Sequence, residues 1–160
     1  MKKINLFIIV VISLVLTGCG SIDFTKTETV TFYDLVVEIP KAFTIDNENS
    51  NSNMQFYSYN DKEKYNSCMF DLFISDYPKS NMREAIQEDF YDITDWSYSE
   101  KDINGYRWSI GYKENSVKYN QTYYVINKNG KEYKIGYSDF GSGEQCAEAL
   151  KIIEESLKFN

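Results

Sequence analysis

The sequence predicts an α+β domain in which an antiparallel sheet carries a helix on each face. Three observations lead to this prediction. Short runs rich in β-branched and aromatic residues dominate the chain, and Asn-Gly turns at residues 104–105 and 129–130 indicate tight hairpins. The apolar period becomes helical at residues 82–90 and 146–157. The resulting order, four strands, a helix, four strands and a helix, favours short connections around one sheet.

The first four strands are predicted between residues 28 and 75. Residues 28–33 and 35–39 are short β-rich runs, and Pro40 ends the second. Residues 54–59 give a third strand and residues 68–75 a fourth. Apolar side chains alternate onto one face of the fourth strand: Cys68, Phe70, Leu72 and Ile74. That face is expected to lie against the core.

The two hairpin turns predict how the later strands pair. Around the first turn, Asp102 faces Arg107 and Tyr98 faces Gly111. Around the second turn, one face is expected to carry five apolar side chains: Tyr124, Ile126, Tyr133, Ile135 and Tyr137. Tyr123 and Val125 point to the opposite face. A strand that is apolar on both faces is predicted to lie centrally and to be covered on both sides.

Helical spacing and caps predict the two helices. The first has Met82, Ala85, Ile86 and Phe90 on one side. Asn81 caps this helix, and Glu84 completes a pair that resembles a capping box. The last helix begins after Ser142 and has an apolar stripe of Cys146, Ala149, Leu150, Ile153 and Leu157.

The beginning of the chain predicts export and lipidation. A positive start is followed by the apolar run 6–16, which is too short to span a bilayer and has the length of a signal-peptide core. Leu16-Thr17-Gly18-Cys19 then resembles the lipobox of bacterial lipoproteins. The thiol of Cys19 is the expected acyl acceptor, so the protein is predicted to be lipid-anchored on the extracytoplasmic face of the cell membrane.

This interpretation divides the chain into three parts. Residues 1–18 are the predicted signal peptide, residues 19–27 a lipidated tether, and residues 28–160 a single domain. The net charge is −7 for the whole chain and −9 once Lys2 and Lys3 are removed with the signal peptide. An acidic domain is repelled by anionic lipid, so the acyl group must hold it at the membrane. The same charge argues against nucleic acid as a partner.

The composition also argues against several kinds of catalysis. The chain has no histidine and no Ser-x-x-Lys, so the usual nucleophile–base pairs have no support. The loop at Asp46 and Glu48 faintly resembles a calcium loop but lacks the required glycine. No spacing singles out a pair of carboxylates for glycoside hydrolysis. We therefore predict no enzyme activity, no catalytic residues, no metal ligands and no cofactor.

Two cysteines remain after Cys19, and both point toward a core. Cys68 lies on the apolar face of its strand and Cys146 on the apolar stripe of the last helix. In an oxidising compartment they can form a disulfide. They can equally remain separate buried thiols, which pack as small apolar residues. The order of strands cannot be obtained from the sequence, so both interpretations stay open.

The candidate binding residues are Trp96, Tyr98 and Arg107. The planar guanidinium of Arg107 is suited to a ligand carboxylate, although Asp102 directly opposite offers a structural pair. Most of the aromatic residues alternate with polar residues on strands, which is typical of packing. Trp96 and Tyr98 are the expected exceptions, because they share a face with Asp102 and Arg107.

Two segments resemble PsbP-like domains. Residues 35–43, Leu-Val-Val-Glu-Ile-Pro-Lys-Ala-Phe, are similar to their opening strand, and residues 152–159 to their closing helix. The resemblance covers about residues 28–159 and implies an α/β/α sandwich, a fold that many small bacterial lipoproteins share. Characterised relatives, the photosystem II extrinsic protein and a nuclear import factor, work by binding proteins. The resemblance therefore implies a binding domain.

Together these observations predict a non-catalytic, lipid-anchored domain that binds a protein or another envelope component. The main alternative is a receptor for a small molecule or glycan, with a pocket between sheet and helix. The weakest alternative is a carboxylate-based hydrolase. A broad exposed apolar patch would favour a protein partner, and a deep pocket with convergent polar groups would favour a small ligand.

Overall fold

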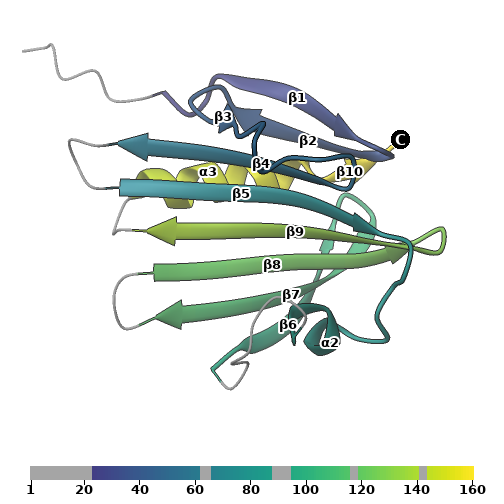
Figure 1. The fold of residues 1–160 in the computed structure, drawn as a ribbon. Helices are drawn as coiled ribbons and strands as arrows, with labels where there is room; N and C mark the ends of the chain where they lie inside the picture. The colour runs from purple at the N-terminus through teal and green to yellow at the C-terminus, as the bar shows by residue number, and fades with distance from the viewer. Residues whose placement is uncertain (1–22, 62–65, 88–94, 116–118, 141–143) are drawn as a thin grey trace, which may run out of the picture.

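The computed structural model describes residues 23–61, 66–87, 95–115, 119–140 and 144–160 (Figure 1). Four predicted features lie outside these ranges: the signal peptide, lipidation at Cys19, the helical position of Phe90 and the helix cap at Ser142. Neither helix among the described residues is long and apolar enough to cross a bilayer.

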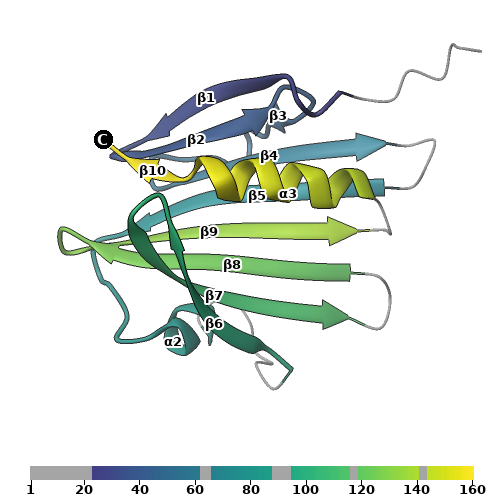
Figure 2. The ribbon, with the colours of Figure 1, turned by 180° about the vertical axis from the view of Figure 1, so that it is seen from behind.

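Two antiparallel sheets and two helices build the domain (Figures 1 and 2). The larger sheet has seven strands in the order β3-β4-β5-β9-β8-β7-β6. They are β3 (Thr44–Ile45), β4 (Met54–Asp61), β5 (Asn66–Ser75), β6 (Ser97–Ile103), β7 (Tyr106–Asn115), β8 (Tyr119–Lys128) and β9 (Lys131–Phe140). The smaller sheet has the order β1-β2-β10, with β1 (Thr27–Phe32), β2 (Leu35–Pro40) and β10 (Lys158–Phe159). The helices are α2 (Met82–Gln87) and α3 (Glu144–Ser156).

The predicted α/β/α sandwich, with a helix on each face of one sheet, is wrong. The domain is a β-rich fold made mostly of antiparallel strands. One face of the larger sheet packs against α3, and the smaller sheet lies beside this helix (Figure 2). On the opposite face, the described residues of α2, Met82–Gln87, contact β7 and β8. Within the described part of the chain, this helical segment is too short to form a layer over seven strands.

The end of the chain also departs from the prediction. The closing helix was expected to include residues 152–159, but α3 ends at Ser156. Lys158 and Phe159 instead pair with Val36 and Leu35 of β2. Phe159 is 9% exposed, and its ring stacks on Trp108 at 5.8 Å between centroids. The chain leaves the helix because an extended segment places this aromatic ring in the core.

Both predicted hairpin registers are confirmed. Asp102 pairs with Arg107 and Tyr98 with Gly111. In the second hairpin, Tyr124 pairs with Ile135. All four turn residues have positive φ, as a type I′ turn requires: Asn104 (48°), Gly105 (82°), Asn129 (54°) and Gly130 (76°). The local turn chemistry was therefore sufficient to align these strands.

The prediction that the second hairpin lies centrally is also confirmed. β8 and β9 are adjacent in the middle of the larger sheet, between β5 and β7. Residues 121–125 and 132–137 are buried without interruption, on both faces of the sheet. The core itself lies on the α3 side, where the rings and aliphatic side chains of β2, β5, β9 and α3 meet.

A disulfide and several hydrogen bonds hold α3 in place at both of its ends. At its beginning, a disulfide joins Cys146 to Cys68 of β5, and the Tyr137 hydroxyl donates to the Cys146 carbonyl. At its end, the Asn104 side-chain amide donates to the carbonyls of Glu155 and Leu157, each at 2.9 Å. The turn of the β6–β7 hairpin thus satisfies carbonyls that a helix terminus leaves unpaired.

A half-buried acceptor, Glu154, adds a third attachment near the end of the helix. Glu154 accepts a 2.6 Å hydrogen bond from the Tyr124 hydroxyl and pairs with Lys101 of β6. Burial, followed by the hydrogen bond to Glu154, raises the pKa of Tyr124. This phenol therefore stays protonated and keeps donating to the helix at every physiological pH.

Phe24 belongs to the core although it lies within the range predicted as a tether. It is 1% exposed, and its ring lies 5.1 Å from Tyr59 and 6.3 Å from Phe43, measured between centroids. Burial of a phenylalanine contributes roughly 2 kcal/mol. The chain is consequently fixed to the domain only a few residues after the predicted lipidation site.

The disulfide gives the first testable prediction. Replacing both cysteines, Cys68→Ala with Cys146→Ala, should lower the free energy of unfolding by about 4 kcal/mol, because the bridge closes a long loop in the unfolded chain. The two residues are 78 positions apart. Urea unfolding measures the loss, and a reductant should lower the stability of the wild type without affecting the double variant. Equal stability of the two proteins under oxidising conditions would contradict the assignment.

Candidate functional site

The face of the larger sheet opposite α3, here called the α2 face, carries the candidate site. Pairing across five strands places Asp71, Gly136, Tyr123, Gly111 and Tyr98 in one row on this face. The Asp71 carboxylate occupies the space above Gly136, where a Cβ atom would clash with it. Tyr98 pairs with Gly111 in the same row. The absence of a Cβ at Gly136 lets the Asp71 side chain lie across the neighbouring strand.

Two adjoining cavities open on the α2 face beside the beginning of α2. The larger has a volume of about 590 Å³ and is lined by Ser80, Asn81, Tyr98, Ser99, Glu100, Arg107 and Ser109. The smaller, of about 170 Å³, shares Ser80, Asn81, Arg107 and Ser109 and continues to Asn127 and Glu132. We call the larger one the Tyr98 cleft and the smaller one the Glu132 cavity.

The segment before α2 is held over the sheet by a cross-strand pair. Asn127 of β8 and Glu132 of β9 face each other. The Glu132 carboxylate accepts from the backbone N–H of Lys79 at 2.9 Å, and the Asn127 amide donates to the Lys79 carbonyl at 3.0 Å. Two adjacent side chains therefore fix the backbone on both sides of Lys79, a residue that lines the Glu132 cavity.

The predicted cap of α2 is present. Asn81 accepts from the backbone N–H of Glu84 at 3.0 Å. The Glu84 side chain accepts from the hydroxyl of Ser80 at 2.6 Å and from its backbone N–H at 3.2 Å, and the hydroxyl contact is the main cause of a lowered pKa of Glu84. These bonds fix the positions of Ser80 and Asn81 at the rim of the Tyr98 cleft.

Arg107 has a different principal partner from the one predicted. Asp102 faces it directly, but the Arg107 Nη1 lies 3.6 Å from Asp102 Oδ2. Glu100 is closer, with its Oε2 at 2.7 Å from Nη2 and 2.9 Å from Nε. The hydrogen bond to Glu100 is the first cause of the raised pKa of Arg107. A long side chain can reach the residue diagonally across a strand pair, as Arg107 reaches Glu100. The register, which pairs Arg107 with Asp102, therefore did not identify its principal partner.

The structure separates the other two candidate residues. Tyr98 is 41% exposed and lines the same cleft as Arg107. Trp96 is 7% exposed and packs edge-on against Tyr123, 5.7 Å between ring centroids. Trp96 therefore packs beside the sheet, and Tyr98 is the aromatic side chain that the cleft presents.

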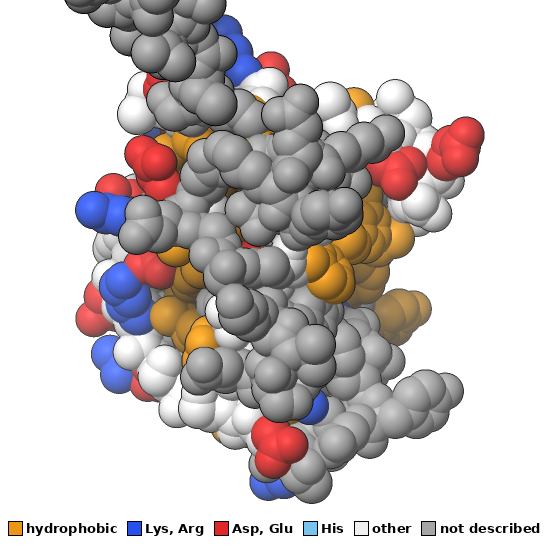
Figure 3. Space-filling model, turned by 90° about the vertical axis from the view of Figure 1, so that its left-hand side faces the viewer, with side chains coloured by type: hydrophobic (Ala, Val, Ile, Leu, Met, Phe, Trp, Pro, Cys, Tyr) orange, Lys and Arg blue, Asp and Glu red, His pale blue; other side chains and the backbone are white. Residues whose placement is uncertain are grey.

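Apolar side chains occupy the other half of the α2 face. Met54, Phe56, Met69 and Phe73 of β4 and β5 are half-buried, and Phe140 of β9 is 37% exposed. Figure 3 shows apolar side chains gathered at its right, on the side that faces the viewer in Figure 1. We call these five residues the apolar patch. The sequence prediction missed it because a full helical layer was expected to cover this face.

A groove of about 460 Å³ between the smaller sheet and α3 matches the pocket expected for a small-molecule receptor. The polar groups on its small-sheet side, however, are bonded to one another or to Ser156 of α3. Glu38 accepts from the hydroxyls of Thr27 at 2.9 Å and Thr29 at 2.6 Å, and the Glu38 N–H donates to the Ser156 hydroxyl at 2.9 Å. A ligand there would meet few convergent polar groups that are not already engaged.

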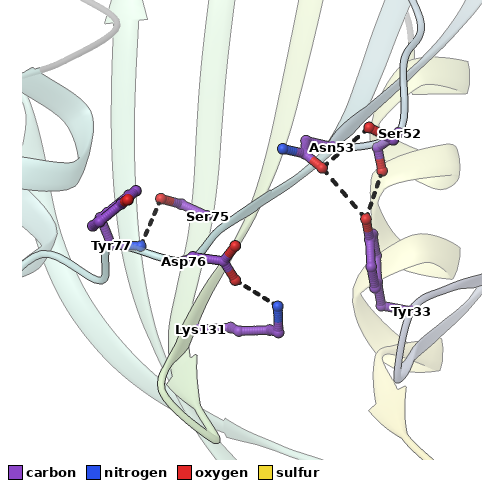
Figure 4. Close-up of polar contacts among 7 residues, drawn as sticks. All are labelled: Tyr33, Ser52, Asn53, Ser75, Asp76, Tyr77 and Lys131. Carbon is purple, nitrogen blue, oxygen red and sulfur yellow. Dashed lines mark hydrogen bonds and ion pairs between the residues drawn. The ribbon is translucent and has the colours of Figure 1, made fainter.

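The loop at residues 46–53 serves to join the two sheets. Tyr33 in the β1–β2 turn donates to the carbonyl of Ser52 at 3.0 Å and contacts Asn53 Oδ1 at 3.3 Å (Figure 4). Nearby, Lys131 pairs with Asp76 at 2.5 Å.

Metal binding and acid–base catalysis both require ionisable side chains gathered at one site. Within the described ranges, no group of His, Cys, Asp and Glu side chains could hold a metal ion. Burial raises the pKa of Asp139 to about 6, but this residue pairs with Cys68 and lies on the α3 face, away from both cavities. It is consequently separate from the candidate site.

Comparison with solved structures places the domain in the fold of PsbP and Mog1. No family model and no curated protein matches the chain. The resemblance to PsbP-like domains is thus confirmed at the level of fold, although the fold is richer in strands than the sandwich expected from it.

Three solved structures illustrate the likeness. The yeast Ran-binding protein Mog1p is 12% identical with a TM-score of 0.55, covering 87% of this chain and 96% of its own. Cyanobacterial PsbP from Synechocystis is 12% identical with a TM-score of 0.54, covering 89% and 98%. A Bacteroides thetaiotaomicron protein is 13% identical with a TM-score of 0.54, covering 84% of this chain. The chain matches about half, 48%, of that protein's length.

The contacts of Arg107 give the second prediction. In double-mutant cycles, the coupling of Arg107→Ala with Glu100→Gln should exceed its coupling with Asp102→Asn, because two of its donors contact Glu100 within 2.9 Å. Urea unfolding of the single and double variants measures both couplings. Arg107→Lys should lose part of the coupling, since an ammonium cannot reproduce the planar fork. Equal coupling to the two acids would contradict the geometry.

Proposed function

We propose that this chain is a lipid-anchored, non-catalytic binding protein on the extracytoplasmic face of the cell membrane, and that its α2 face binds another protein. The observation that carries this proposal is the apolar patch of Met54, Phe56, Met69, Phe73 and Phe140, which is half-exposed or exposed on the same face of the sheet as the polar Tyr98 cleft. Contiguous exposed apolar side chains with a polar rim are typical of protein interaction sites.

The membrane address is supported by the beginning of the sequence. The positive start, the apolar run and the lipobox-like Leu16-Thr17-Gly18-Cys19 occur in the order that export and lipidation require. The mature chain from Cys19 carries a net charge of −9, so electrostatic attraction to anionic lipid cannot hold it. Covalent acyl chains supply the attachment, and more than one chain is needed for stable anchoring.

The α2 face supports a protein partner better than catalysis. The carboxylate that lines the Tyr98 cleft, Glu100, is paired with Arg107 at 2.7 Å. A hydrolase would need two carboxyl groups placed on either side of a scissile bond. The Ran-binding Mog1p has the same fold, which supports protein binding by analogy of fold.

The third prediction tests the anchor. Cells that produce the wild type should retain it in the membrane fraction and incorporate labelled fatty acid into it. Cys19→Ala should abolish the labelling and release the protein from the membrane, because the acyl acceptor is lost. Cys68→Ala provides the matched control and should remain labelled, since its thiol belongs to the buried disulfide. Unchanged labelling of Cys19→Ala would contradict the proposed address.

The fourth prediction tests the binding face. A photo-cross-linkable phenylalanine analogue is placed at Phe56 in the apolar patch, or at the exposed Lys151 on α3 as a matched control. Irradiated cells should give discrete protein adducts from position 56 and none from position 151. High salt should slow formation of the adduct, because an acidic protein associates faster with basic partners. Absence of adducts from position 56, or equal adducts from both positions, would contradict the proposal.

A further inference from the structure

Glu132 is a buried carboxylate, and among the described residues only one of its oxygens has a hydrogen-bond partner. The residue is 1% exposed, and its Oε2 accepts from the Lys79 N–H at 2.9 Å. Within the part of the chain that the structure describes, no donor reaches its buried Oε1. A buried polar atom without a partner is rare in folded proteins, because its desolvation is not compensated. The position of Oε1 therefore requires an explanation beyond the bond to Lys79.

The surroundings of Glu132 form a small built site. The residue lines the Glu132 cavity of about 170 Å³, together with the hydroxyl residue Ser109 and the buried Val125. The Asn127 side chain on the same wall is already engaged with the Lys79 carbonyl. The cavity thus combines an acidic group, a hydroxyl residue and an aliphatic wall, and it opens beside the much larger Tyr98 cleft.

The charge balance of the cavity favours a cation. Arg107 also lines it, but this guanidinium contacts Glu100 at 2.7 Å and Asp102 at 3.6 Å. Two acidic neighbours therefore already neutralise the single charge of Arg107. Lys134, the buried cation two positions along β9 on the same face, directs its Nζ to the Ala85 carbonyl at 3.5 Å. An incoming donor with positive charge would satisfy Oε1 and form a short, charge-assisted hydrogen bond.

We propose that the Glu132 cavity receives the ammonium group of a lysine side chain from a protein partner. An ammonium is a compact point charge on an apolar stem, which suits a small cavity with an acidic group and an aliphatic wall. The planar guanidinium of arginine is bulkier and fits this volume less well. The inference rests on the proposed function, since it names the group through which a partner on the α2 face is anchored.

A conservative variant isolates the charge of Glu132. Glu132→Gln keeps a side-chain oxygen that can accept from the Lys79 N–H, so the segment before α2 stays attached. It removes only the negative charge that an ammonium requires. Glu148→Gln is the matched control, because it removes the same charge from an exposed position on α3. Thermal unfolding of both variants establishes that each remains folded.

The probe is Nα-acetyl-lysine N-methylamide, titrated into the intact lipoprotein in detergent and followed by saturation-transfer NMR. The wild type and Glu148→Gln should bind it saturably. Glu132→Gln should bind it about tenfold or more weakly, as expected for loss of a charge-assisted hydrogen bond. The norleucine analogue, which lacks the ammonium, should not bind saturably, and the arginine analogue should bind more weakly than lysine.

Three results would overturn the inference: no saturable binding of the lysine probe to the wild type, equal binding of the norleucine probe, or equal affinity of Glu132→Gln and Glu148→Gln. Cross-linking from position 56 separates this failure from failure of the proposed function. Adducts from position 56 without binding of the lysine probe would leave the protein-binding face in place and exclude the ammonium site alone.

Discussion

The attachment of α3 to the larger sheet is the constraint on which the rest of the domain depends. A single helix of 13 residues closes the core over β5 and β9, so its position must be fixed at both ends. The Cys68–Cys146 disulfide fixes the beginning, with a Cα–Cα distance of 5.9 Å. Asn104 fixes the end by donating to two carbonyls. The β6–β7 hairpin brings Asn104 to the end of the helix. Residues of the same two strands also line the Tyr98 cleft.

Local chemistry made the hairpins predictable, whereas the arrangement of layers depended on distant contacts. The two Asn-Gly turns require positive φ, and this requirement alone fixed the pairing of Tyr98 with Gly111 and of Tyr124 with Ile135. No local signal shows that β1 and β2 leave the main sheet, because that separation depends on β10 pairing with β2 from the far end of the chain. The helical spacing of Leu157 likewise could not reveal that Phe159 leaves the helix to stack on Trp108.

The candidate site was predictable only where it follows from register. Alternation along β6 and β7 placed Tyr98 and Arg107 on one face, and the structure brings both to one cleft. Register did not reveal that Trp96 packs against Tyr123, or that Glu100 outcompetes Asp102 for Arg107. Glu132 was missed because its burial depends on the Lys79 segment, which crosses the sheet from 53 positions earlier in the chain. In sequence it is an ordinary acidic residue next to a turn.

The two faces of the larger sheet differ in how much apolar side-chain surface they leave exposed, and this difference supports the α2 face as the proposed binding face. On the α3 face, large apolar side chains are buried against the helix and the smaller sheet. The free energy of their burial therefore already stabilises the fold. On the α2 face, a short helix covers β7 and β8, while apolar side chains on β4 and β5 stay half-exposed. Those side chains gain burial only when another molecule covers them, at roughly 25 cal/mol for each Å² of apolar surface. Among the described residues no donor reaches the second carboxylate oxygen of Glu132, so under the proposal a positively charged group of the partner would bind there. The apolar patch would then contribute affinity, and Glu132 would contribute selectivity for that charge.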